Sequence, residues 1–127
     1  MGVEALPVSQ SVSIGPNGSE RPIKRAAISG ASANNTLVGA VTGKRILVVF
    51  ANLSWIDATT TGSWKLQSGA STDLTPAFQT LVTSNGFCNI VWPYNPFGWV
   101  ITVVSEKLNL VLATVDSFAS LIGYVEV

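Results

Sequence analysis

The chain has 127 residues, which is the length of one domain. Charged residues make up only 11% of the chain and their signs cancel, so neither nucleic acid nor a strongly charged partner is expected. The longest apolar run, residues 46–51, is far shorter than the roughly 20 residues of a membrane-spanning helix, so no membrane segment is expected. We attribute the scarcity of charge to surface that another subunit covers. The first four residues lack the basic and apolar regions of a signal peptide, so we expect synthesis in the cytoplasm.

The first 25 residues differ from the rest and predict an extended N-terminal arm. Prolines and glycines interrupt this segment repeatedly. Val8, Val12 and Ile14 alternate with serines, which indicates a short extended piece. Two interpretations stay open: a disordered leader, or an arm that adds a strand to the sheet of a neighbouring molecule.

Residues 26–127 predict one β-domain of short strands separated by turn signals. The pattern is strongest at residues 45–56, where every second residue from Leu47 to Trp55 is apolar. Trp64 and Leu66 are expected to point inward. Asn85-Gly86 between two apolar runs predicts a hairpin of residues 76–82 with residues 87–94. The expected strands are 26–32, 36–41, 45–56, 63–67, 76–82, 87–94, 99–104, 108–113 and 118–127.

The last strand continues to Val127 and carries apolar residues on both faces, so we expect the C-terminus to be tied into a sheet. No segment shows a sustained helical period of apolar residues. Short strands with regular turn signals predict an all-β, antiparallel β-sandwich. About eight strands in about 100 residues indicate a jelly roll.

The residues on which many enzymes rely are missing. The chain has no histidine, which excludes Ser-His-Asp and Cys-His catalysis. The single cysteine, Cys88, leaves no ordinary zinc site. Two alternatives have no support from spacing: a carboxylate pair, or a Ser-Lys pair. We therefore expect no enzyme, no metal and no cofactor. The residues of these alternatives are Asp57, Asp73, Glu106 and Asp116, and Ser63 with Lys65 or Ser105 with Lys107.

Four aromatic residues flank one proline-rich loop: Trp92, Tyr94, Phe97 and Trp99. Such a set can stack on the apolar face of a sugar, and it can equally fill a core or a subunit contact. Large aromatic side chains occur more often in cores and interfaces. We favour burial and keep a sugar-binding platform as the alternative.

Several short motifs resemble those of a group of small proteins encoded by tailed bacteriophages. In that group they read approximately N-T-L-V-A-A-V-x-G-K-x-I, P-x-N-P-x-G-W, G-E-x-L-N-L-x-L and a terminal Y-V-E-V. This chain is similar at residues 33–46, 93–99, 105–112 and 123–127. It departs at Ser105, where the pattern has Gly. The resemblance covers about residues 28–127 and leaves out the arm.

Members of this group with an assigned role look like capsid decoration (cement) proteins, which are β-sandwich trimers on the outer shell of the phage head. The resemblance therefore implies a virion structural protein on the capsid surface, which binds the major capsid protein as a homotrimer. It also implies subunit contacts along the C-terminal strands and the aromatic loop. These contact residues are Trp92, Tyr94, Phe97, Trp99, Phe118, Ile122 and Tyr124.

The arm would then contact the capsid. Its basic end is expected to meet an acidic patch on the shell or a neighbouring trimer, or else to form a solvated linker. The alternative function is a fibre-tip or receptor-binding β-module that recognises a host surface glycan. The arm residues expected at the capsid are Val8, Val12, Ile14, Arg21, Lys24 and Arg25.

Overall fold

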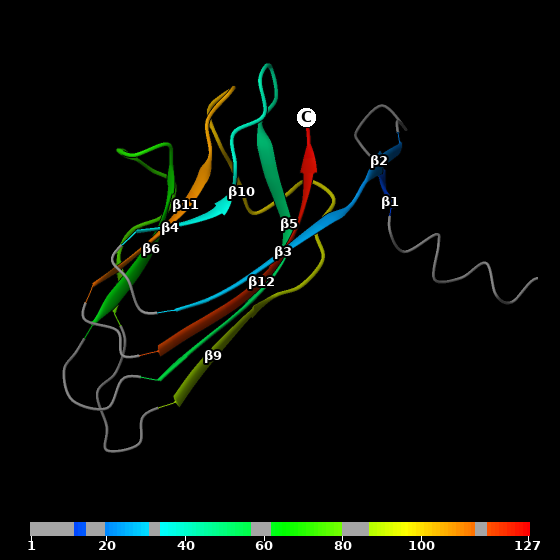
Figure 1. Cartoon of the computed structure of the whole chain (residues 1–127). Coiled ribbons are helices and arrows are strands. Elements are labelled where there is room, and N and C mark those ends of the chain that lie inside the picture. The colour runs from blue at the N-terminus through cyan, green and yellow to red at the C-terminus, as the bar shows by residue number, and fades with distance from the viewer. Residues whose placement is uncertain (1–11, 15–19, 31–33, 57–61, 80–86, 114–116) are drawn as a thin grey trace, which may run out of the picture.

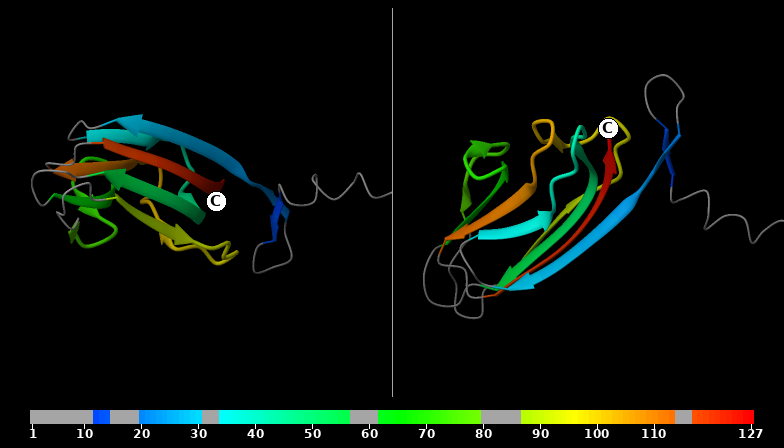
Figure 2. Two further views of the ribbon diagram at one scale, coloured as in Figure 1. Left: turned by 90° about the horizontal axis from the view of Figure 1, so that it is seen from below. Right: turned by 45° about the horizontal axis from the view of Figure 1, so that its top comes forward.

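The computed structural model describes residues 12–14, 20–30, 34–56, 62–79, 87–113 and 117–127. These residues form strands and turns, and no helix long and apolar enough to span a membrane occurs among them. Two antiparallel sheets of five strands each face one another, and a two-stranded hairpin lies beside them (Figure 1 and Figure 2). The predicted all-β sandwich is confirmed.

The first sheet is built around its longest strand, β5. Its order is β10–β5–β12–β3, and β9 also pairs with β5. Because β9 and β10 pair with different parts of the same strand, they form one interrupted edge strand. The bounds are β3 (Lys24–Gly30), β5 (Ile46–Ile56), β9 (Phe87–Trp92), β10 (Val100–Ile101) and β12 (Ser117–Glu126).

The second sheet has the order β4–β11–β6–β7, and β8 also pairs with β6. The pairings of the two sheets are nested: β3 with β12, β4 with β11, β5 with β9 and β10, and β6 with β7 and β8. With each interrupted strand counted once, this is the eight-stranded order of a jelly roll. The bounds are β4 (Asn34–Val38), β6 (Ser63–Ser68), β7 (Thr72–Asp73), β8 (Phe78–Gln79) and β11 (Leu108–Ala113).

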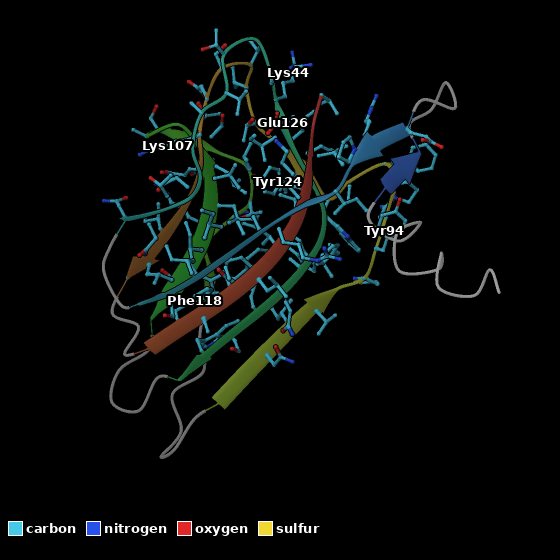
Figure 3. All side chains as sticks on the ribbon, turned by 45° about the vertical axis from the view of Figure 1, so that its right-hand side comes forward. Lys44, Tyr94, Lys107, Phe118, Tyr124 and Glu126 are labelled. Atoms are coloured by element: carbon cyan, nitrogen blue, oxygen red, sulfur yellow. The ribbon has the colours of Figure 1, made fainter. Side chains whose placement is uncertain are left out.

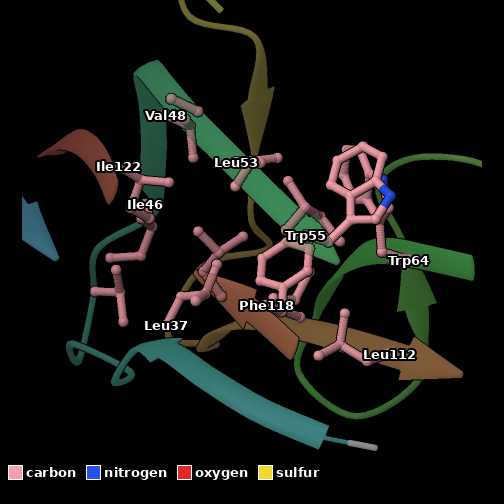
Figure 4. Packing of buried hydrophobic residues seen from close by; sticks show 14 residues of the cluster. Leu37, Ile46, Val48, Leu53, Trp55, Trp64, Leu112, Phe118 and Ile122 are labelled. Carbon is pink, nitrogen blue, oxygen red and sulfur yellow. The ribbon is translucent and has the colours of Figure 1, made fainter. Parts of the chain in front are cut away.

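The main core fills the space between the sheets (Figure 4). Alternate residues of β5, β6, β11 and β12 enter it, because successive side chains of a strand point to opposite faces. Trp64 and Leu66 are buried there, as their alternation predicts. The ring of Trp55 lies between two other aromatic rings, with centroids 5.9 Å from Trp64 and 6.1 Å from Phe118.

A second apolar cluster lies on the other face of β5. Ile46 and Val48 belong to the main core, whereas Leu47 and Val49 pack with Val125 in this second cluster. The register of β5 with β12 shifts between Gly123 and Tyr124, and such a bulge re-aims the side chains that follow it. Both faces of β5 are therefore buried at this end. Partly buried members of the second cluster are Ile23, Phe50 and Val127.

The two ends of the chain differ in how they join the sandwich. β1 (Val12–Ile14) and β2 (Glu20–Pro22) pair as a hairpin that stands apart from the two sheets in Figure 1. β3 begins at Lys24, inside the predicted arm. At the other end, Val127 and Arg45 exchange two backbone hydrogen bonds of 2.8 and 3.0 Å. The C-terminus is tied into the structure, as expected.

The predicted hairpin between residues 76–82 and 87–94 is wrong. β8 pairs with β6 in the second sheet, whereas β9 pairs with β5 in the first. The rings of Phe78 and Trp64 have centroids 4.7 Å apart, and this contact fixes β8 on the second sheet. A local Asn-Gly signal does not specify which sheet the flanking runs join. Asn85-Gly86 itself lies outside the described residues.

The predicted strand at residues 99–104 is also shorter than expected, because only Val100–Ile101 forms a strand. The Ile46 backbone N–H donates to the Thr102 side-chain oxygen at 2.8 Å rather than to a backbone carbonyl. A turn follows, in which the Glu106 N–H donates to the Val103 carbonyl at 3.2 Å. The side-chain acceptor and this turn together end the ladder.

Candidate partner-binding surface

The proline-rich loop at residues 93–99 interrupts the edge strand. Trp92 is opposite Ala51 and Val100 is opposite Val48. A continuous strand would need only two residues to bridge this gap, and the loop takes their place. The loop remains fastened to β5, since the Asn95 N–H donates to the Val49 carbonyl and the Trp99 N–H to the Val48 carbonyl, both at 2.8 Å.

The tip of the loop is a compact turn at Asn95-Pro96-Phe97-Gly98. The Gly98 N–H donates to the Asn95 carbonyl at 2.9 Å, and the Phe97 N–H donates to the Asn95 side-chain oxygen at 3.0 Å. Gly98 has a φ of 83°, and a Cβ there would overlap the Leu47 side chain. Pro96 restricts the backbone further. The turn is therefore held in one shape.

This turn displays aromatic side chains to solvent. Phe97 is 75% exposed, Tyr94 is 49% exposed and Trp99 is 42% exposed. Two contacts fix the ring of Trp99. It stacks on the ring of Trp92 with centroids 5.5 Å apart, and its indole N–H donates to the Pro93 carbonyl at 2.8 Å. Figure 3 shows Tyr94 near the hairpin of β1 and β2. A solvent-exposed aromatic on a fixed scaffold loses little conformational freedom when it is covered.

Three exposed aliphatic residues continue this surface along the chain. We call the whole set the aromatic rim: Tyr94, Phe97, Trp99, Ile101, Val103 and Val104. No charged residue occurs in the sequence between Asp73 and Glu106. Exposed apolar residues gathered in one short segment are typical of a site that a partner covers. The aliphatic members were not predicted as contact residues, because they belong to the strand predicted at residues 99–104, although the long uncharged stretch was a usable signal.

The aliphatic end of the rim is also fixed. The buried Ser68 hydroxyl donates to a Glu106 carboxylate oxygen at 2.6 Å and accepts from the Val103 N–H at 2.8 Å. Ser105 has a φ of 64°, and its hydroxyl oxygen accepts from the Gly43 N–H at 2.8 Å. The backbone at residue 105 is therefore left-handed, the conformation that Gly adopts most easily, and this is the position where the phage pattern has Gly.

The structure separates the residues predicted for subunit contact into two groups. Tyr94, Phe97 and Trp99 lie on the surface, and Trp92 is half-buried beneath them. Phe118 and Ile122 are 2% and 1% exposed and belong to the main core, so their assignment to a subunit contact is corrected. Tyr124 is half-buried against the same core. The polypeptide itself already covers these inner residues of β12.

Two of the three basic residues predicted for the arm, Lys24 and Arg25, have partners within the monomer. Lys24 donates to Glu126 across 2.7 Å, and this hydrogen bond and the carboxylate charge raise the pKa of Lys24 above its ordinary value. The Arg25 guanidinium lies 5.9 Å from the centre of the Phe50 ring. Both residues belong to β3, so their assignment to a free arm is corrected.

Three other predicted arm residues lie in the hairpin of β1 and β2. Arg21 is in β2, and Val12 and Ile14 are in β1, where they pair with Pro22 and Glu20. Val8 lies outside the described residues.

The acidic residues are spread over the described parts of the chain. Asp73 binds Lys65 at 3.1 Å and accepts from the Gln67 amide at 2.8 Å. The Gln67 hydrogen bond and then Lys65 lower the pKa of Asp73. Where side chains are placed, no three His, Cys, Asp or Glu residues gather as a metal site would require. Asp57 and Asp116 lie outside the described residues.

No protein-family model matches the sequence, and no curated protein matches it either. Among solved structures, a chain in "Structure of infectious bursal disease virus Gx strain" is 13% identical over 84% of this chain and 33% of its own length, with a TM-score of 0.39. The EclA C-terminal domain, a sugar-binding protein, is 12% identical over 85% of this chain and 86% of its own, with a TM-score of 0.38. A chain of the T13 particle of infectious bursal disease virus is 14% identical over 85% of this chain and 32% of its own, with a TM-score of 0.38. This chain thus spans about a third of the two viral chains, and these weak likenesses carry no functional argument.

Proposed function

We propose that this protein is a structural protein of a tailed-phage particle, specifically a capsid decoration protein that binds the major capsid protein shell as a homotrimer and stabilises it. The observation that best supports this role is the aromatic rim, a set of exposed apolar residues carried by a fixed loop and the segment that follows it. The rim turn coincides with the P-x-N-P-x-G-W motif that resembles phage proteins. Such a surface suits a permanent protein contact, whose buried centre is depleted in charge.

The rim serves the contact between subunits in this proposal, and the N-terminal hairpin of β1 and β2 serves the contact with the shell. The hairpin stands apart from the sandwich (Figure 2), so it can reach another molecule without disturbing the core. Its described side chains Glu20 and Arg21 include both signs of charge. We locate the protein on the capsid surface, after synthesis in the host cytoplasm.

A second candidate is a receptor-binding module for a host glycan, which the exposed rings of Tyr94 and Trp99 favour. Sugar recognition also needs polar groups placed beside the ring, because hydroxyls must be hydrogen-bonded. Within the rim turn, both polar atoms of the Asn95 side chain already have partners. Its oxygen accepts from the Phe97 N–H, and its nitrogen donates to the Gly98 carbonyl at 3.4 Å. The scarcity of available polar groups makes us favour a protein partner.

The test is co-sedimentation of the purified protein with phage shells that lack it, together with its mass by light scattering. We expect a trimer that saturates the shell at a fixed ratio to the major capsid protein. A variant lacking residues 1–22 retains Ile23 and Lys24, which belong to the sandwich. We expect it to stay trimeric and to bind shells more weakly. Absence of wild-type binding to shells, with binding to a glycan array that Trp99→Ala abolishes, would instead establish the second candidate.

A further inference from the structure

The outer face of the first sheet carries a shallow hollow of about 190 Å³. It lies between β5 and β12, where Ala119 is opposite Ser54 and Leu121 is opposite Asn52. An apolar cavity of about 150 Å³ accepts one benzene molecule, whereas pockets for small-molecule ligands run from about 300 Å³ upward. The hollow is therefore the size of a single aromatic ring. Its lining is uncharged and half polar: Asn52, Ser54, Ala119, Ser120 and Leu121.

The same chain carries a ring that is presented for such a hollow. Phe97 is the most exposed of the large apolar residues in the described segments, and the turn that carries it is held by hydrogen bonds at Asn95 and Gly98. Phe97 does not occupy the hollow of its own chain, since it is 75% exposed. Its loop joins β9 to β10 along one edge of β5, while the hollow adjoins β12 on the other.

We propose that Phe97 of one copy inserts into the hollow of a second copy. The fit in size favours this occupant, and the residues of the rim turn and of the lining are all uncharged, so none of them loses the hydration of a charged group when the two meet. A contact between two different parts of the surface forms twice in a two-fold dimer and once between each pair of neighbours in a closed ring, and a trimer requires the ring. The number of copies, three, rests on the proposed function; the contact itself does not.

Two substitutions test the contact from its two sides. Phe97→Ala removes the ring, and Ala119→Trp fills the hollow. We expect each variant to weaken self-association about tenfold or more, as for the central residue of an interface. Ala70→Trp, at an exposed position in the turn after β6 and outside the rim, is the matched control for the added Trp and should leave the association intact. Circular dichroism and thermal melting verify that every variant is folded.

Mixing the two variants provides the decisive measurement. The Phe97→Ala chain keeps its hollow and the Ala119→Trp chain keeps its ring, so one good contact can form between them. We expect native mass spectrometry to show a one-to-one heterodimer in the mixture and monomers of each variant alone. An oligomer that both variants preserve, a mixture that stays monomeric, or a wild-type protein that is monomeric at its highest soluble concentration would each overturn the inference. Failure of the wild-type trimer to bind shells, with heterodimer formation intact, would refute the proposed function alone.

Discussion

The ring of Phe50 in β5 covers the backbone of Gly123, its partner in β12, so closely that a Cβ on Gly123 would overlap the ring. Arg25 lies over the same ring from β3. This stack is located at the bulge where the second apolar cluster begins. A residue without a side chain in β12 thus allows the aromatic ring to lie flat across the sheet.

Replacing Gly123 with Ala is expected to lower the free energy of unfolding by about 1–3 kcal/mol, the usual effect of overpacking. The loss should shrink in a Phe50→Ala background, because the overlapping ring is gone. Urea denaturation of the two single variants and the double variant measures this coupling. Gly39→Ala is the matched control: a Cβ there has no atom within 4 Å, so stability should stay unchanged or rise slightly. Equal losses at Gly123 in both backgrounds would contradict the stack.

The same Phe→Ala substitution at two positions distinguishes the core from the rim. Phe118→Ala should lower the free energy of unfolding by about 3–5 kcal/mol, because it opens a cavity beside Trp55. Phe97→Ala should change it by no more than about 0.5 kcal/mol in dilute protein, where subunits are separate. Thermal and urea unfolding of both variants provide the comparison. A large loss for Phe97→Ala under those conditions would show that this ring supports the monomer.

Ser105 has a left-handed backbone and one compensating hydrogen bond from Gly43. Ser105→Ala should destabilise the protein by about 1 kcal/mol, because it removes the hydrogen bond and keeps the unfavourable conformation. Ser105→Gly removes the same bond but relieves the conformation, so we expect it to be more stable than the Ala variant by about 1 kcal/mol. Denaturation midpoints of the two variants decide the matter. Equal stabilities would mean that the backbone angle there is of no consequence.

The lowered pKa of Asp73 predicts an acid-dependent contribution to stability. The folded value lies below the unfolded value of about 3.9, so the contribution is fully present above that pH and is lost as pH falls through the folded pKa. The Tm difference between wild type and Asp73→Asn should therefore be present at neutral pH and shrink in strong acid. Lys65→Met should remove only part of the stabilisation that Asp73 contributes, since Gln67 remains as a partner. A difference that stays constant throughout acid titration would disprove the linkage.

Much of the fold followed from local pattern. Alternation at residues 45–56 predicted β5, the inward positions of Trp64 and Leu66 were confirmed, and the closing strand is tied into a sheet as expected. These features are local, because a strand displays its two faces at every second residue whatever its neighbours are. The count of strands and the lack of a helical period then left few architectures for a chain of this size.

Other features depended on partners distant in the sequence. Alternation showed that Phe118 shares a face with Ile122, but only the second sheet decided that this face is covered. Lys24 and Glu126 are 102 residues apart, so their ion pair required the first and last strands of the sandwich to be neighbours. β8 joined the second sheet through Trp64, against a strong local hairpin signal.

Local pattern therefore specified most of the strands and the β-sandwich class, and composition excluded histidine chemistry, because these depend only on residue types and on neighbours in the sequence. The pairing of strands and the packing of the two sheets determined which aromatic residues are core and which are surface, and they assembled the hollow from β5 and β12. This is so because burial requires two faces. The sequence of a strand specifies which side chains share a face, and the fold decides whether another sheet covers that face or leaves it open to a partner.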